Sequence, residues 1–200
     1  MKGWGWYSTK TLQMVPLMPS TPVYVDGMLS HIYYELKRLG RIEQTMCGDH
    51  FNHDKWIHYF ESLKTAQILC RVTPAEKLVV LGMSWISNPR GVDGARAVQC
   101  GFAFIEDGSS GTSDARNLAR LALAYGFIDL RVNCIHGVQV IDNIAARNFA
   151  MRLGFREVAQ VPNYHAVDGR LVDARVMMLM DEDFLPGFYE WKEKQAKVIA

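Results

Sequence analysis

The segment best suited to hold an anionic ligand is a short polar loop in the second half of the chain. Two glycines three residues apart stand among hydroxyl residues, directly before a helix-like pattern: Gly108-Ser109-Ser110-Gly111-Thr112-Ser113. Backbone N–H groups of such a loop can point at one place, and the dipole of the following helix adds positive potential there. The loop therefore suits a pyrophosphate. An ordinary strand-to-helix turn with a Ser or Asp cap is the alternative interpretation.

The loop is neither of the two best-known phosphate motifs, because it lacks Gly-Lys-Ser/Thr and does not fit GxGxxG. The helix that follows it begins with charged residues. Asp114 would compete with a bound anion unless its carboxylate faces away, whereas Arg116 and Arg120 could lend positive charge to phosphates. A solvated helix face is the alternative role for these arginines.

A second group of motifs lies downstream. Asn143 opens a helical pattern that carries Ala146 and ends at Leu153-Gly154-Phe155. An Asn at this place predicts an N-cap, and the glycine ends the helix so that the chain can turn back into a strand. Asp168-Gly169-Arg170 then predicts a tight hairpin turn, with Asp173 in the strand after it.

Together these motifs resemble the GNAT superfamily of N-acetyltransferases, whose members often carry N-x-x-A, a closing L-G-F, and a hairpin with D-G and a following Asp. The resemblance covers roughly the second half of the chain and is most specific from Asn143 to Leu179. It implies that the protein uses acetyl-CoA as co-substrate to acetylate a primary amine. It also implies that Asn143 hydrogen-bonds the pantetheine arm, that Ala146 lies in the cofactor site, and that residues 108–113 hold the pyrophosphate.

The resemblance also implies where the reaction takes place. In the family, the strand before the phosphate loop splays from its neighbour, and a free backbone N–H there stabilises the oxyanion. The matching stretch is Ala103 to Glu106, so Phe104 and Ile105 are expected in the cofactor site. Glu106 is the candidate base for an alkyl ammonium, whose pKa is about 10. A solvated carboxylate at a strand end is the alternative for Glu106.

Two departures from the family pattern bear on activity. The phosphate motif, usually Q/R-x-x-G-x-G/A, lacks its first side chain and ends in Ser113. Many members place a Tyr as general acid seven residues after the Asn, where this chain has Ala150. Because a thiol pKa near 8.5 makes a thiolate a good leaving group, we expect a slower enzyme and not an inactive one. Tyr164 could replace the missing acid, although aromatic strand residues ordinarily pack.

The elements that must position these residues follow from the apolar spacing. The spacing predicts helices, then an antiparallel meander, then a β-loop-α-β-α-β-β order. This order gives an α/β (α+β) fold with a mixed, largely antiparallel sheet flanked by helices, and one parallel strand pair with a crossover. Asp26 is the expected cap of the first helix and Gly126 the expected end of the third. The expected helices span 26–39, 52–64, 115–125 and 143–153, and the strands 66–72, 77–87, 96–106, 128–135, 156–166 and 171–180.

The length indicates one domain over residues 1–200, which the resemblance implies is GNAT-like. An N-terminal arm or irregular strand is expected in 1–25 and a C-terminal helix or tail in 186–200. Apolar residues make up 49% of the chain and the net charge is +1. A sizeable core is therefore expected, whereas a nucleic acid or a membrane is not an expected partner. Four scattered cysteines indicate reduced thiols in a cytoplasmic protein, and no signal peptide is evident.

Histidines and aspartates gather near the start of the second helix, but no metal site is predicted. Their spacing matches no standard ligand set, and a surface helix start explains them better. The residues concerned are Asp49, His50, His53, Asp54 and His58.

Two other functions remain open beside the acetyltransferase hypothesis. A catalytically weak or inactive module on the same fold could bind acyl-CoA or a protein partner, and an assembly protein would have an empty cleft. No sequence feature identifies the acceptor, so small-molecule and peptide amines are both candidates. A homodimer is open as well.

Overall fold

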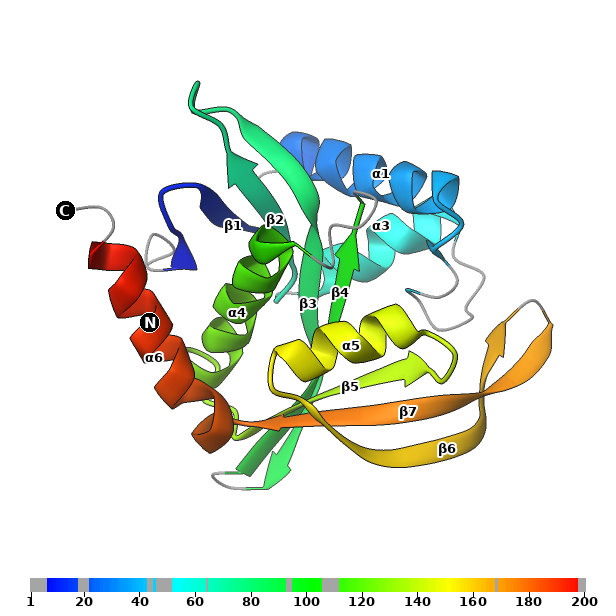
Figure 1. The fold of residues 1–200 in the computed structure, drawn as a ribbon. Helices are drawn as coiled ribbons and strands as arrows, with labels where there is room; N and C mark the ends of the chain where they lie inside the picture. The colour runs from blue at the N-terminus through cyan, green and yellow to red at the C-terminus, as the bar shows by residue number, and fades with distance from the viewer. Residues whose placement is uncertain are drawn as a thin grey trace.

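A seven-stranded sheet with helices on both faces organises the protein (Figure 1). The computed structural model describes residues 7–17, 22–42, 45, 52–63, 65–92, 95–105, 112–167 and 169–197. The strands are β1 (Leu12–Pro16), β2 (Gln67–Val72), β3 (Leu78–Val92), β4 (Ala95–Phe104), β5 (Cys134–Val140), β6 (Arg156–Val167) and β7 (Arg170–Met180). The helices are α1 (Pro22–Arg38), α3 (His53–Ser62), α4 (Ser113–Ile128), α5 (Ile144–Arg152) and α6 (Asp181–Lys197).

The strand order is β1-β2-β3-β4-β5-β7-β6. Every neighbouring pair is antiparallel except β4 and β5, which are parallel and joined by the crossover helix α4. This confirms the expected fold class, a mixed and largely antiparallel sheet. The exception matters for function, because the parallel pair lies in the middle of the sheet and divides it into two antiparallel halves.

Two apolar cores lie on opposite faces of the sheet. The helices α4, α5 and α6 cover one face (Figure 1), where Leu118, Phe149 and Phe188 are buried. The other face is covered by α1 and α3, which bury Leu36 and Trp56. Strand side chains alternate between the two faces, so both layers are fixed by the same strands. Burial of each large apolar side chain stabilises such a core by about 1.5–3 kcal/mol.

Several local predictions are confirmed by helix ends and turns. The helix expected at 52–64 is α3, and Asn52 caps it by accepting a hydrogen bond from the Lys55 N–H. Gly154 follows α5 with φ +99°, and Gly169 lies in the β6–β7 turn with φ +72°. Both backbone conformations are ones that glycine adopts without a steric penalty.

Two predicted helix boundaries are wrong. α1 begins at Pro22, which suits a first helical turn, so Asp26 lies inside the helix and does not cap it. α4 continues through Gly126 to Ile128. A Cβ added to Gly126 would lie 2.9 Å from the Ile135 side chain, so this glycine allows close helix–sheet packing and does not end the helix.

The other element ends agree with expectation to different degrees. The strand expected at 128–135 is β5, which begins only at Cys134. Residues 1–25, expected as an arm or an irregular strand, contain the strand β1, which pairs with β2. The C-terminal helix starts at Asp181, where three acidic residues occupy the first turn and complement the helix dipole.

Candidate functional site

The central feature of the site is a gap between β4 and β5. The two strands pair only from Ala97–Cys134 to Gln99–His136, although β4 runs on to Phe104 and β5 to Val140. Figure 1 shows the strands running apart. β4 stays paired with β3, and β5 stays paired with β7, so the two halves of the sheet diverge. The expected splay is therefore confirmed.

Backbone groups on the free edge of β4 face this gap. The N–H of Ile105 donates to the Leu81 carbonyl at 3.0 Å, which directs Ile105 toward β3. In an antiparallel ladder, successive residues direct their N–H and C=O groups to opposite edges. The N–H groups of Phe104 and Phe102 therefore point into the gap, where each could stabilise a negative charge on a bound carbonyl oxygen.

A cavity of about 290 Å³ occupies the gap. Its walls come from Gln99–Phe104 of β4, Gly137–Gln139 of β5 and one side of α5. Leu36 and Trp85 also line it, and both belong to the opposite core. The cavity thus passes through the sheet from the α5 face to the α1 face. Two substrates could reach one point in it from opposite sides.

Asn143 lies at the start of α5 and in the wall of the cavity. Its side-chain Oδ1 accepts a hydrogen bond from the Ala146 N–H at 3.0 Å, so the predicted N-cap is confirmed. Asn143 and Ala146 both line the cavity. Because capping uses the oxygen, the amide nitrogen is the group that remains to donate to a ligand.

The start of α4 lies beyond the end of β4. Thr112 is its N-cap, with the side-chain oxygen accepting from the Ala115 N–H at 3.2 Å, and Ser113 is the first helical residue. The preceding loop residues Gly108, Ser109, Ser110 and Gly111 lie outside the described residues, as does Glu106. Their expected roles stay predictions.

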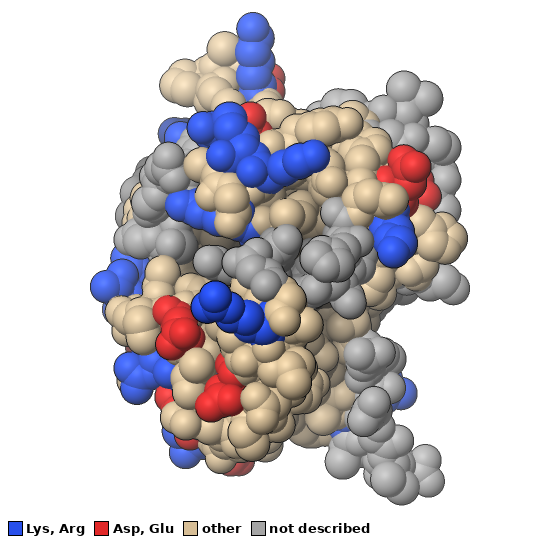
Figure 2. All heavy atoms as spheres, turned by 90° about the vertical axis from the view of Figure 1, so that its right-hand side faces the viewer, with Lys and Arg blue, Asp and Glu red and all other residues tan. Residues whose placement is uncertain are grey.

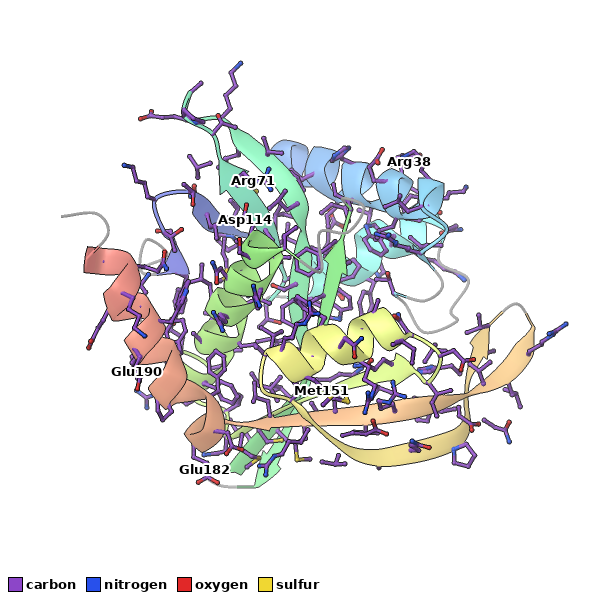
Figure 3. All side chains as sticks on the ribbon, viewed as in Figure 1. Arg38, Arg71, Asp114, Met151, Glu182 and Glu190 are labelled. Carbon is purple, nitrogen blue, oxygen red and sulfur yellow. The ribbon has the colours of Figure 1, made fainter. Side chains whose placement is uncertain are left out.

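Asp114, in the first turn of α4, forms an ion pair with a residue of β2. Its carboxylate pairs with the Arg71 guanidinium of β2 at 2.7 Å, and Figure 3 shows the two side chains together beside α4. This ion pair offsets the negative charge that would oppose an anion at the helix N-terminus. Arg120 lies further along α4, with its guanidinium 5.9 Å from the centre of the Trp191 ring. Burial lowers its pKa, with a smaller contribution from Arg116.

The remaining predicted site residues are divided between the cavity and other places. Phe104 lines the cavity, and its ring lies 5.4 Å from that of Phe149. Ile105 is buried in the core under α1 and α3. Ala150, at the position of the family Tyr, lines the cavity. Tyr164 is 53% exposed on β6, with its ring against His165, and does not line the cavity.

Sequence reasoning missed the residues contributed by the α1 side. Arg41 and Thr45, just beyond α1, line the cavity together with Leu36. Figure 2 shows Lys and Arg side chains gathered over this end of α1, whose last turn carries Lys37 and Arg38. A basic helix end is an ordinary surface feature, so only the tertiary structure connects it with the cavity.

The cavity wall is poor in groups that transfer protons at neutral pH. Among the described residues, no Asp, Glu, His or Tyr lines it. Cys100 does, and burial raises the pKa of its thiol to about 12, so the thiol stays protonated. The described residues also contain no group of three His, Cys, Asp or Glu side chains that could hold a metal ion.

Comparison with solved structures identifies this architecture. A GCN5-related N-acetyltransferase from Brucella melitensis superposes with a TM-score of 0.69 at 14% identity, over 94% of this chain and 83% of that one. Mycobacterium smegmatis RimJ in complex with CoA-disulfide gives 0.67 at 16% identity, over 86% and 82%. Vibrio cholerae spermidine N-acetyltransferase, in complex with CoA and spermine, gives 0.61 at 16% identity, over 87% and 98%.

The chain therefore has the fold of the GNAT acetyltransferases. At the level of sequence, no family model and no curated protein matches it. In the part of the chain that the structure describes, no helix is long and apolar enough to span a membrane.

Proposed function

We propose that the protein transfers an acetyl group from acetyl-CoA to a primary amine. The observation that carries this proposal is the cavity between the diverging strands β4 and β5, which passes through the sheet between α5 and α1. A thioester could enter from the α5 side and an amine from the α1 side. The fold shared with CoA-bound acetyltransferases supports the same assignment.

The reaction forms a bond between the amine nitrogen and the thioester carbonyl carbon, and it breaks the bond between that carbon and sulfur. The backbone N–H of Phe102 or Phe104 would stabilise the oxyanion of the tetrahedral intermediate. The amine loses its proton to a base or to water, and the thiolate takes one up after departure. Since a thiol pKa is about 8.5, the sulfur leaves without an acid at Ala150.

The cofactor contacts are assigned by position. Asn143 and Ala146 would bind the pantetheine arm, and the start of α4, with Gly108–Ser113, would bind the pyrophosphate. Glu106, two residues beyond β4, remains our candidate base. Tyr164 is the weaker candidate acid, because it is exposed on β6 and absent from the cavity wall.

The acceptor is a primary amine of a small molecule or of a peptide, and we infer that the protein acts in the cytoplasm. Similar structures include both a spermidine N-acetyltransferase and a ribosomal-protein-S5-alanine acetyltransferase. Acceptors of both kinds therefore belong in a screening panel.

A second candidate function is that of a module that binds acyl-CoA without catalysing acyl transfer. The specific observation in its favour is that no Asp, Glu, His or Tyr of the described residues lines the cavity. Thioester cleavage, followed as released CoA thiol with a panel of amines, separates the two functions. Amine-dependent release supports the enzyme, whereas tight binding of acetyl-CoA without release supports the module.

A further inference from the structure

The cavity has a closed end, where the pairing of β4 with β5 begins. Cys100 and Gly137 are the first residues beyond the last pair, Gln99–His136, and both line the cavity. Met177 lies opposite Gly137 on β7. α5 covers this end with Ala150, and Leu153 and Phe155 follow the helix. Five of the six, all except Gly137, belong to or border the core on the α5 face, so the closed end has an apolar wall on that face.

The opposite end of the same cavity is polar. Asn143 and Gln139 line it at the start of α5 and the end of β5. The Gln139 Oε1 is buried, and it has no hydrogen-bond partner among the residues that the structure describes. A ligand with an amide-containing arm and an apolar tip matches this gradient, with its tip at the closed end.

The packing of the strands does not require a glycine at position 137, beside the space at the closed end. A Cβ added to Gly137 would meet only the Cys100 carbonyl oxygen, at 3.8 Å, which is ordinary contact. Gly101, on the neighbouring strand, differs: a Cβ there would lie 2.0 Å from the Trp85 ring. Packing therefore requires a glycine at 101 but not at 137. The room beside Gly137 belongs to the cavity.

Resting on the proposed acyl transfer, we propose that the closed end receives the acyl chain of the donor, and that the protein accepts linear apolar acyl groups longer than acetyl. Gly137 and Ala150, on facing walls, set the chain length. Phe102 lies two residues beyond Cys100, which is about 7 Å along the strand. A thioester carbonyl held at the Phe102 N–H would thus leave room for several carbons before the end of the cavity.

Binding of a donor series by calorimetry tests this proposal without a known acceptor. The probes are acetyl-CoA, butyryl-CoA and hexanoyl-CoA with the full chain. Burial of each added methylene strengthens binding by roughly fourfold, so butyryl-CoA is expected to bind on the order of tenfold more tightly than acetyl-CoA. Equal or weaker binding of both longer donors, with acetyl-CoA still bound, overturns the inference and leaves the proposed function intact.

Two variants connect the preference to the closed end. Gly137→Val and Ala150→Leu each fill it from one side, and each is expected to reduce the hexanoyl-to-acetyl affinity ratio at least tenfold. Gly187→Val is the matched control, because a Cβ at Gly187 on α6 meets nothing within 4 Å; it should leave the ratio unchanged. If both variants fold and keep the wild-type hexanoyl-to-acetyl affinity ratio, the inference is overturned. If no CoA thioester binds the wild type, the proposed function itself fails.

Discussion

At the scale of single residues, Asn143 combines a structural role with a proposed ligand contact. Its oxygen caps α5 by accepting from the Ala146 N–H, and its amide nitrogen is the proposed donor to pantetheine. The sequence predicts the cap because it depends only on residues three apart. The ligand contact needs the cavity, which no local pattern reveals.

Substitution separates these two roles. We expect Asn143→Ala to lower the free energy of unfolding by about 1 kcal/mol, because the cap is lost. Asn143→Ser keeps a capping oxygen and should keep the stability. Both variants lack the amide and should bind CoA roughly fivefold more weakly, the equivalent of one hydrogen bond. Wild-type CoA affinity in Asn143→Ser would restrict Asn143 to capping.

Arg71 and Asp114 show what sequence reasoning missed at this scale. The competition between Asp114 and an anion was predictable, but its partner lies 43 positions away on β2. Only the fold brings the two together.

We expect Arg71→Met to weaken CoA binding about two- to fivefold at low salt, because it leaves an unpaired carboxylate in the first turn of α4. Adding Asp114→Asn should restore the affinity, and the effect should shrink as salt rises. Titrations at two ionic strengths measure this. An affinity unchanged by Arg71→Met would place the bound phosphates elsewhere.

At the scale of elements, glycine positions explain both successes and errors. Gly154 and Gly169 follow periodic segments, so their roles as a helix end and a turn could be predicted from the sequence. Gly126 has the same appearance in the sequence, but it is buried against the sheet and lies inside α4. Periodicity alone does not separate a glycine that ends a helix from one that packs.

Gly82 holds β3 and β4 close together. A Cβ there would lie 2.0 Å from the Ala103 carbonyl oxygen, and this backbone atom moves only with the strand. We expect Gly82→Ala to destabilise the protein by about 1–3 kcal/mol or more. Gly187→Ala, in open space on α6, is the control and should be neutral or slightly stabilising. Equal urea midpoints for the two variants would contradict the strand geometry.

At the scale of the whole molecule, the order of elements and the mixed sheet could be predicted, since alternating strand and helix patterns force a crossover. The cavity could not. Its wall combines residues of β3, β4, β5, β7, α5 and the end of α1. In the sequence, the apolar residues of this wall cannot be distinguished from residues that pack in the core.

Because its thiols are buried, the protein is expected to lose stability as the pH becomes alkaline. Burial raises the pKa of Cys70 to about 12, whereas an unfolded thiol titrates near 8.5. The folded state therefore keeps a proton that the unfolded state loses. This contribution is complete below pH 8.5 and decreases as the pH rises toward 12, by about 1.4 kcal/mol per pH unit.

Cys70→Ala should accordingly flatten the fall in stability between pH 8.5 and 10.5. Urea unfolding at several pH values measures the slope, and the difference between wild type and variant isolates this thiol from the lysines and tyrosines. Parallel curves for the two proteins would show that Cys70 does not titrate between the folded and unfolded states.

The melting temperature in the presence of CoA and acetyl-CoA shows whether the gap between β4 and β5 binds the cofactor. A ligand that binds only the folded state at 100 times its Kd stabilises it by about 2.7 kcal/mol. We predict an upward shift of several degrees with either ligand at millimolar concentration, and a smaller shift for Asn143→Ser. No shift with either ligand would contradict the assignment of the gap between β4 and β5 as a CoA site.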